Sequence, residues 1–269
     1  MQSKKMVGHY TQMVWSDSVY IGCGLSSEQK DGWIYYYFVC NYGPSGNYLG
    51  EKPYPSGTPS GHLTCSIDDC KHPFAATPLT CAQIKTIVNG HNERRLELAQ
   101  GAVFDQPDAS EMNAVIWDEE LAAKASKWAS RNIFEHNPDR SIGSNRFTTG
   151  ENIYWQGSTD KNLKFNPESA LNSWFNEHKD YTYGPLTSEQ IESKKMIGHY
   201  LQMVWSDSVY IGCGLSSQEK DGWINYYFVC NYGPSGNYLG EEPYPSGAPS
   251  GYLTCSVDDC KHPFGDKCY

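Results

Sequence analysis

Positive charge is scarce in this chain. Its 269 residues include 21 lysines and arginines against 31 aspartates and glutamates, which gives a formal net charge of -10 at pH 7. A surface that neutralises nucleic-acid phosphates needs clustered lysine and arginine side chains. The composition therefore argues against nucleic acid as a partner.

Long apolar runs and two well-known hydrolase motifs are also absent from the sequence. No run approaches the roughly 18 to 20 apolar residues that cross a bilayer, because a polar residue or a glycine interrupts each candidate. Neither HExxH nor GxSxG occurs. We therefore expect a protein without a transmembrane segment, and the missing motifs weaken a hydrolase interpretation.

The first residues lack the features of a secretion signal. The opening MQSKKMVGHYTQ contains neither a basic n-region nor the apolar h-region that follows it in such signals. We expect that Met1 is not the native start of the protein.

Cysteine is plentiful, and its spacing favours disulfides over metal binding. The ten cysteines are an even number, and none of the pairs has the Cys-x2-Cys spacing typical of zinc sites. Paired cysteines in an even number are typical of oxidising compartments, so we predict a secreted, extracellular protein. The predicted disulfide cysteines are Cys23 with Cys40, Cys65 with Cys70, Cys213 with Cys230, Cys255 with Cys260, and the remaining Cys81 and Cys268.

The dominant feature of the sequence is an internal repeat. Residues 3–74 reappear as residues 193–264, shifted by 190 positions, and the two copies match at 63 of 72 positions. The first copy has two strand-like runs, Val19–Leu25 and Trp33–Asn41, but no helix to cover their faces. We therefore predict a partial domain at 1–74, a linker at 75–80 and a complete domain at 81–269, with self-association through the orphan first half.

Hydrophobic periodicity predicts alternating helices and strands in the second part. Asp118 is expected to cap the second helix, and Pro167 to occupy the first turn of the third. Tyr181–Ser193 is predicted to be a connection, and the chain after Tyr232 an extended tail. The predicted helices are Ala82–Gln100, 119 to near His136, and Glu168–Asp180; the predicted strands are Gly150–Gln156, Val209–Leu215 and Trp223–Asn231.

Several motifs occur together in one order. These are HNERR at His91, WASRNIFEHN, GENIYW, SALNSWFNEHKDYTYG, GHYLQMVW and FVCNYGPSGNYLG. In this combination the chain resembles the CAP superfamily of cysteine-rich secretory proteins, insect venom allergens and plant pathogenesis-related proteins. The resemblance implies an α+β fold, a three-layer α-β-α sandwich with a small antiparallel sheet, followed by an extended C-terminal tail held by a disulfide.

The resemblance also implies a central cleft lined by two histidines and two glutamates. The matching positions are His136, Glu151, Glu177 and His199. Two imidazoles and two carboxylates suit zinc or another divalent cation, which would not be required for folding. The alternative is structural, because buried His–Glu pairs also tie helices to sheets by hydrogen bonds.

Three further histidines receive no role in that cleft. His91 lies on an apolar helix face and is interpreted as a packing residue, and His178 as a solvated or interface residue. His9 matches His199, but its own half of the repeat lacks the three partner residues.

Two classes of function remain open from the sequence. The first is a non-enzymatic binding module for lipids, sterols or extracellular proteins, for which Tyr154–Phe165 and Trp174 could line an apolar groove. Ordinary core packing is the alternative for these aromatic residues. The second is a metal-dependent hydrolase in which Glu177 or Glu151 acts as general base; of the two, the binding module is favoured.

Overall fold

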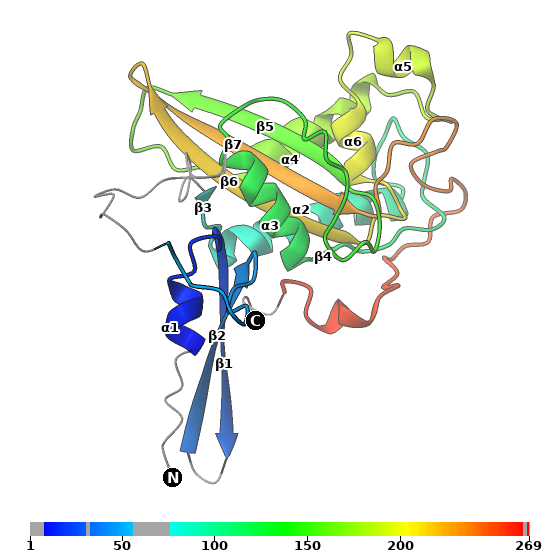
Figure 1. The fold of residues 1–269 in the computed structure, drawn as a ribbon. Helices are drawn as coiled ribbons and strands as arrows, with labels where there is room; N and C mark the ends of the chain where they lie inside the picture. The colour runs from blue at the N-terminus through cyan, green and yellow to red at the C-terminus, as the bar shows by residue number, and fades with distance from the viewer. Residues whose placement is uncertain (1–7, 31–32, 56–75, 266–267, 269) are drawn as a thin grey trace. The chain divides into compact units, whose positions relative to one another are not determined.

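The computed structural model of the chain describes residues 8–30, 33–55, 76–265 and 268. The chain divides into two compact units, Met1–Pro73 and Phe74–Tyr269. Both units combine helices with small β-sheets, so the fold has mixed α and β content (Figure 1). Among the residues described, no helix is both long enough and apolar enough to cross a bilayer.

The described residues of the first unit form a short helix and a β-hairpin. Helix α1 is Gly8–Met13, and strands β1 (Tyr20–Lys30) and β2 (Trp33–Gly43) pair antiparallel. Both strands are longer than predicted. Every residue of β1 is exposed, so neither face of this two-stranded sheet is covered within the part of the unit that the structure describes.

The second unit contains most of the helices and a five-stranded sheet. Its strand order is β3-β6-β7-β5, and β4 pairs with β6 in parallel. The elements are β3 (Ala76–Thr77), α2 (Cys81–Ala99), β4 (Ile116–Trp117), α3 (Glu119–Ala129), β5 (Gly150–Ser158), α4 (Pro167–Phe175), a 3₁₀-helix (Asn176–Asp180), α5 (Ser188–Glu192), α6 (Gly198–Met203), β6 (Tyr210–Lys220), β7 (Trp223–Gly233) and a second 3₁₀-helix (Asp258–Lys261).

The two hairpins have the same register. Cys213 lies opposite Cys230 in β6 and β7, as Cys23 lies opposite Cys40 in β1 and β2. In the second unit, however, β7 also pairs with β5 and β6 with β3. Strand β3 falls inside the predicted linker 75–80, because Ala76 and Thr77 continue the sheet along the edge of β6.

Helices cover the two faces of the larger sheet. Because side chains alternate along a strand, Phe228 and Tyr232 of β7 share one face, where Phe228 stacks on Trp174 of α4 and Tyr232 contacts His91 of α2. Val229 faces the opposite way and packs with residues of α3. Figure 1 shows α3 lying across β6 and β7.

The predicted helix starts are confirmed. Thr80 caps α2 through a capping box with Gln83, and the side chain of Asp118 accepts a hydrogen bond from the Leu121 amide. Pro167 stands in the first turn of α4, where a missing amide hydrogen costs nothing.

The predicted end of the second helix was wrong. Helix α3 ends at Ala129 rather than near His136. Asn132 adopts a left-handed conformation with φ of 55°, which a helix cannot continue through. Residues 133–137 therefore form a loop, and this loop carries His136 to the site described below.

Two further boundaries also differ from the prediction. The helix expected over Glu168–Asp180 is α-helical only to Phe175 and then tightens into the 3₁₀-helix. The expected connection Tyr181–Ser193 contains α5, which Thr187 caps with Gln190 through a second capping box. Such a short helix has too few residues to show a hydrophobic period.

Disulfides join Cys23 to Cys40, Cys213 to Cys230, Cys255 to Cys260 and Cys81 to Cys268. The last of these bonds spans 187 residues and ties the start of α2 to the end of the chain. A cross-link over so long a loop strongly restricts the unfolded chain. Cys65 and Cys70 lie outside the described residues.

Candidate functional site

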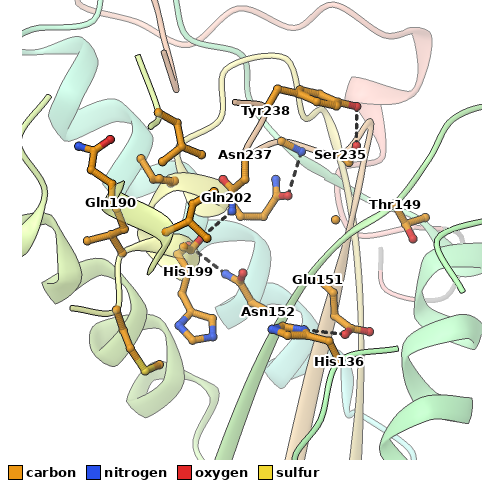
Figure 2. A pocket seen from close by; sticks show the side chains of 18 of the residues that line it. His136, Thr149, Glu151, Asn152, Gln190, His199, Gln202, Ser235, Asn237 and Tyr238 are labelled. Carbon is orange, nitrogen blue, oxygen red and sulfur yellow. Dashed lines mark hydrogen bonds and ion pairs between the residues drawn. The ribbon is translucent and has the colours of Figure 1, made fainter. Parts of the chain in front are cut away.

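Three of the four predicted site residues line one cavity of the second unit. The cavity has a volume of about 650 Å³, and its walls include His136 from the loop after α3, Glu151 from β5 and His199 from α6. Figure 2 shows the side chains of His136 and His199 among those that line this space. Glu177 lies behind His199, to which it is hydrogen-bonded.

Glu151 holds His136 in place from the sheet. Its Oε1 accepts hydrogen bonds from Nδ1 of His136 at 2.9 Å and from the Asn137 amide at 2.8 Å. Its Oε2 accepts a bond from the Asn231 side chain at 3.3 Å. The Glu151 side chain is fully buried, whereas 56% of the His136 side chain is exposed. The carboxylate is therefore fixed, and the imidazole reaches from it towards solvent.

Glu177 performs the same task for His199 from the 3₁₀-helix. Its Oε1 accepts a bond from Nδ1 of His199 at 2.7 Å. Its Oε2 accepts bonds from the amides of His199 and Tyr200, at 3.0 and 3.1 Å, in the first turn of α6. A carboxylate at this position satisfies amides that have no partner inside the helix. Glu177 thus orients both the ring and the helix that carries it.

Both pairs leave the same ring nitrogen facing away from the carboxylate. When the imidazole is neutral and Nδ1 donates its hydrogen, Nε2 carries the lone pair. Within the described part of the chain, neither Nε2 has a hydrogen-bond partner. A carboxylate that fixes the tautomer in this way is the usual support of a metal-binding histidine. Among all the residues that the structure describes, no three histidine, cysteine or acidic side chains lie close enough together to hold a metal ion.

A buried chain of hydrogen bonds supports the floor of the site. The side-chain amide of Asn152 donates to the backbone oxygen of His199 at 3.0 Å and to the Tyr232 hydroxyl at 3.1 Å. The hydroxyl lies 2.9 Å from Nε2 of His91, whose Nδ1 donates to the Ile87 carbonyl. Burial lowers the pKa of His91 to about 3, so the ring is neutral and the packing interpretation of His91 is confirmed.

Gln202 joins α6 to the strands around it. Its side-chain oxygen accepts a bond from the Gly236 amide at 3.0 Å, and its amide donates to the Ser208 hydroxyl. A Cβ on Gly150 would lie 1.9 Å from that oxygen, so a larger residue there would displace the Gln202 side chain from these hydrogen bonds. In the first unit Gln12 bonds Gly46 and Ser18 in the same way. Within two nearly identical copies this glutamine does not stand out, so sequence reasoning missed it.

Arg95 fixes the loop that follows α6. It is fully buried, and its guanidinium donates to the backbone oxygens of Met203, Ser208, Trp205 and Asn113 at 2.8 to 2.9 Å. Burial lowers its pKa to about 9, which still leaves it charged at neutral pH. The HNERR motif includes Arg95, but sequence reasoning gave it no role.

Of the two interpretations of His178, a solvated or an interface residue, the solvated one was wrong. Only 13% of its side chain is exposed, and its Nδ1 lies 2.7 Å from a carboxylate oxygen of Asp105. The 3₁₀ turn directs the ring towards the loop after α2, away from the cavity. In the first unit His9 is exposed.

The aromatic residues proposed for an apolar groove belong mostly to the core. Trp174 is 1% exposed and Phe165 is 6% exposed. Trp174 stacks on both Phe228 and His199. For these two residues the packing interpretation is confirmed, and Trp174 forms the wall behind the His199 ring.

Comparisons with known proteins agree on one family. A model described as the cysteine-rich secretory protein family, CAP, matches residues 1–42 and 88–232. Venom allergen 3 of Solenopsis invicta is 39% identical over 179 residues, which are 64% of this chain and 75% of that protein. The solved structure of NaASP2 with Zn²⁺ is 26% identical, with a TM-score of 0.56 over 67% of this chain and 98% of the other. BmVAL-1 is 30% identical, with a TM-score of 0.55 over 64% of this chain and 85% of the other.

Proposed function

Because the chain belongs to the CAP family of cysteine-rich secretory proteins, we propose that it is a secreted binding protein with a divalent-cation site in the second unit. The observation that carries this proposal is the pair of His–Glu hydrogen bonds at one cavity. Each fixes an imidazole with Nε2 directed away from its carboxylate. The solved relative with Zn²⁺ adds support by likeness.

The donor set suits zinc or a neighbouring transition metal rather than calcium or magnesium, because imidazole nitrogens are its only directly available ligands. His136 and His199 would hold the ion, and Glu151 and Glu177 would keep the two rings oriented. With two protein ligands, water or a ligand atom would complete the coordination, and the bound ion would supply positive charge to the cavity. Such a site should be weaker than a closed structural zinc site.

The proposal is tested by calorimetric titration of the chelator-treated full chain with Zn²⁺. We expect saturable binding, and we expect His136→Gln and His199→Gln each to weaken it at least about tenfold, because each removes one of two ligands. His178→Gln is the matched control, since His178 also pairs with a carboxylate but lies outside the cavity. Absence of saturable binding, or equal loss in the control, would refute the site.

We also propose that the same cavity takes an apolar ligand of the lipid or sterol class. Part of its wall is apolar and includes exposed Ile191 and Met196. We expect a fluorescent fatty acid or sterol to bind saturably, and Met196→Asp to weaken it about tenfold by placing a charge against the apolar chain. Phe104→Asp, at an exposed residue away from the cavity, serves as control. Equal affinities of the two variants would contradict the proposal.

The hydrolase alternative is less well supported. A general base needs a carboxylate oxygen within reach of the water that it deprotonates. Both oxygens of Glu177 accept hydrogen bonds from α6, and both of Glu151 accept bonds from its neighbours. This arrangement favours an orienting role for both carboxylates.

We also propose the domain organisation that the repeat implies. Residues 1–74 would correspond to the C-terminal half of a CAP domain and 81–269 to a complete domain with three α-β-α layers and a disulfide-held tail. Residues 75–80 would connect them, with Ala76–Thr77 adding an edge strand to the sheet of the second unit. The family match to residues 1–42, in addition to 88–232, supports this division. So does the shared register of the two hairpins.

A further inference from the structure

The hairpin of the first unit carries a groove on one face. It has a volume of about 550 Å³, and its residues lie mainly at alternate positions of β1 and β2. Gly22 and Gly24 form the floor, and a Cβ added to either would meet no atom within 4 Å. Val39 beside them is 59% exposed. Among the residues that the structure describes, the groove is therefore open, apolar along its centre and free of side chains over both glycines.

In the second unit the equivalent surface lies directly beneath α3. A Cβ on Gly212 would lie 2.1 Å from the backbone nitrogen of Ala122, and one on Gly214 would lie 2.3 Å from Cα of Ser126. Real Cβ atoms do not approach other atoms so closely. The helix backbone thus rests on the two glycines, and Val229 is completely buried beside it.

The two surfaces are chemically identical. Every residue that lines the groove has the same amino acid at the matching position of the second copy, and none of the nine differences between the copies falls among them. The strands also have the same register. The matched positions are Gly22 with Gly212, Gly24 with Gly214, Ser26 with Ser216, Tyr37 with Tyr227, Val39 with Val229, and Asn41 with Asn231.

We propose that this groove is a docking site for an amphipathic helix of another polypeptide. The helix would carry small residues where it crosses Gly22 and Gly24, as α3 carries Ala122 and Ser126, which are one turn apart and share a face. A larger side chain there would hold the helix away from the sheet. The occupant is a separate polypeptide because α3 of a second copy already lies on its own sheet, with Ala125 fully buried.

A peptide with the sequence of residues 118–132 is the probe, titrated by fluorescence anisotropy into the full chain. A side-chain lactam between Glu120 and Lys124 holds it helical, because an isolated helix of this length is marginal in water. In α3 the Glu120 side chain accepts a hydrogen bond from Ser144, and the Lys124 side chain donates one to the Asp139 carbonyl. Both point away from the sheet, so the lactam leaves the docking face of the peptide unchanged. We expect saturable binding that Gly24→Val weakens at least tenfold, because the new side chain occupies the floor.

Two controls separate this groove from general stickiness of the hairpin. Ile21→Ala changes an exposed residue on the opposite face of β1 and should leave the affinity unchanged. A peptide with leucine at both Ala122 and Ser126 should lose binding. No saturable binding, or equal binding to Gly24→Val, overturns the proposal. A dimer of the chain that Gly24→Val dissociates would make a second copy the occupant and would overturn the assignment to a separate polypeptide.

Discussion

Replacing Gly214 with valine is expected to destabilise the second unit by about 3 kcal/mol or more, whereas Gly24→Val should leave stability within about 0.5 kcal/mol of the parent. The two glycines occupy equivalent positions of the repeat. A Cβ on Gly214 would overlap the backbone of α3 at Ser126, but one on Gly24 would meet nothing within 4 Å. Backbone atoms of a packed helix cannot move aside as a flexible side chain can.

Urea unfolding of both variants, followed by tryptophan fluorescence and circular dichroism, measures this difference. Gly24→Val serves as an internal control for the loss of glycine from a strand, which by itself is usually neutral or favourable. Equal destabilisation by the two substitutions would show that the backbone of α3 is not packed tightly against the sheet at Gly214. It would also remove the basis for a helix-docking groove on the first unit.

Replacing Arg95 with methionine is expected to cost about 3 to 5 kcal/mol. Methionine retains the length of the apolar stem but removes the guanidinium donor from four backbone carbonyls. Of these, the Trp205 carbonyl still accepts a hydrogen bond from the Ser208 amide, and the other three lose the donor described here. A buried polar pair can be replaced without loss of stability when both partners become apolar. The partners of Arg95 are backbone carbonyls, which no substitution can make apolar. Within the described residues Arg95 forms no ion pair, so the loss would come from these carbonyls.

The same denaturant titration measures this effect, with Arg131→Met as the control. Arg131 is exposed and lies over the Trp128 ring, so its replacement should change stability by about 0.5 kcal/mol or less. Arg95→Lys should recover only part of the loss, because a single ammonium group cannot span carbonyls that a planar guanidinium reaches. Zn²⁺ affinity should fall as well, since Arg95 fixes the loop after the helix that carries His199. Full stability in Arg95→Met would contradict this account.

Local signals in the sequence predicted the starts of the main helices and the paired strands. Asp118 and Pro167 each act through a few neighbouring backbone groups, so their effect is visible in a short window of sequence. The end of α3 was missed because Asn132, rather than a glycine or proline, turns the chain. The 3₁₀-helix after α4 was missed because residues of α- and 3₁₀-helices follow similar patterns over one turn.

The four residues of the candidate site were named only through the family resemblance. They span 63 positions in sequence, from His136 to His199, and no local spacing brings them together. Their pairing in the structure depends on β5 lying beside β7 and on the 3₁₀-helix meeting the first turn of α6. Asn152, Gln202 and Arg95 were missed for the same reason, because each acts on backbone or side-chain groups far away in the sequence.

The sequence by itself determined the repeat, the cysteine pairs of the two hairpins and the family, because these depend on residue identity and short spacing. Only the tertiary structure decided which copy of the repeat is covered. Gly24 and Gly214 have the same neighbours in sequence, yet one is open and the other lies under α3. Burial depends on what other segments place against a surface, and nearly identical strands therefore have different environments in the two units.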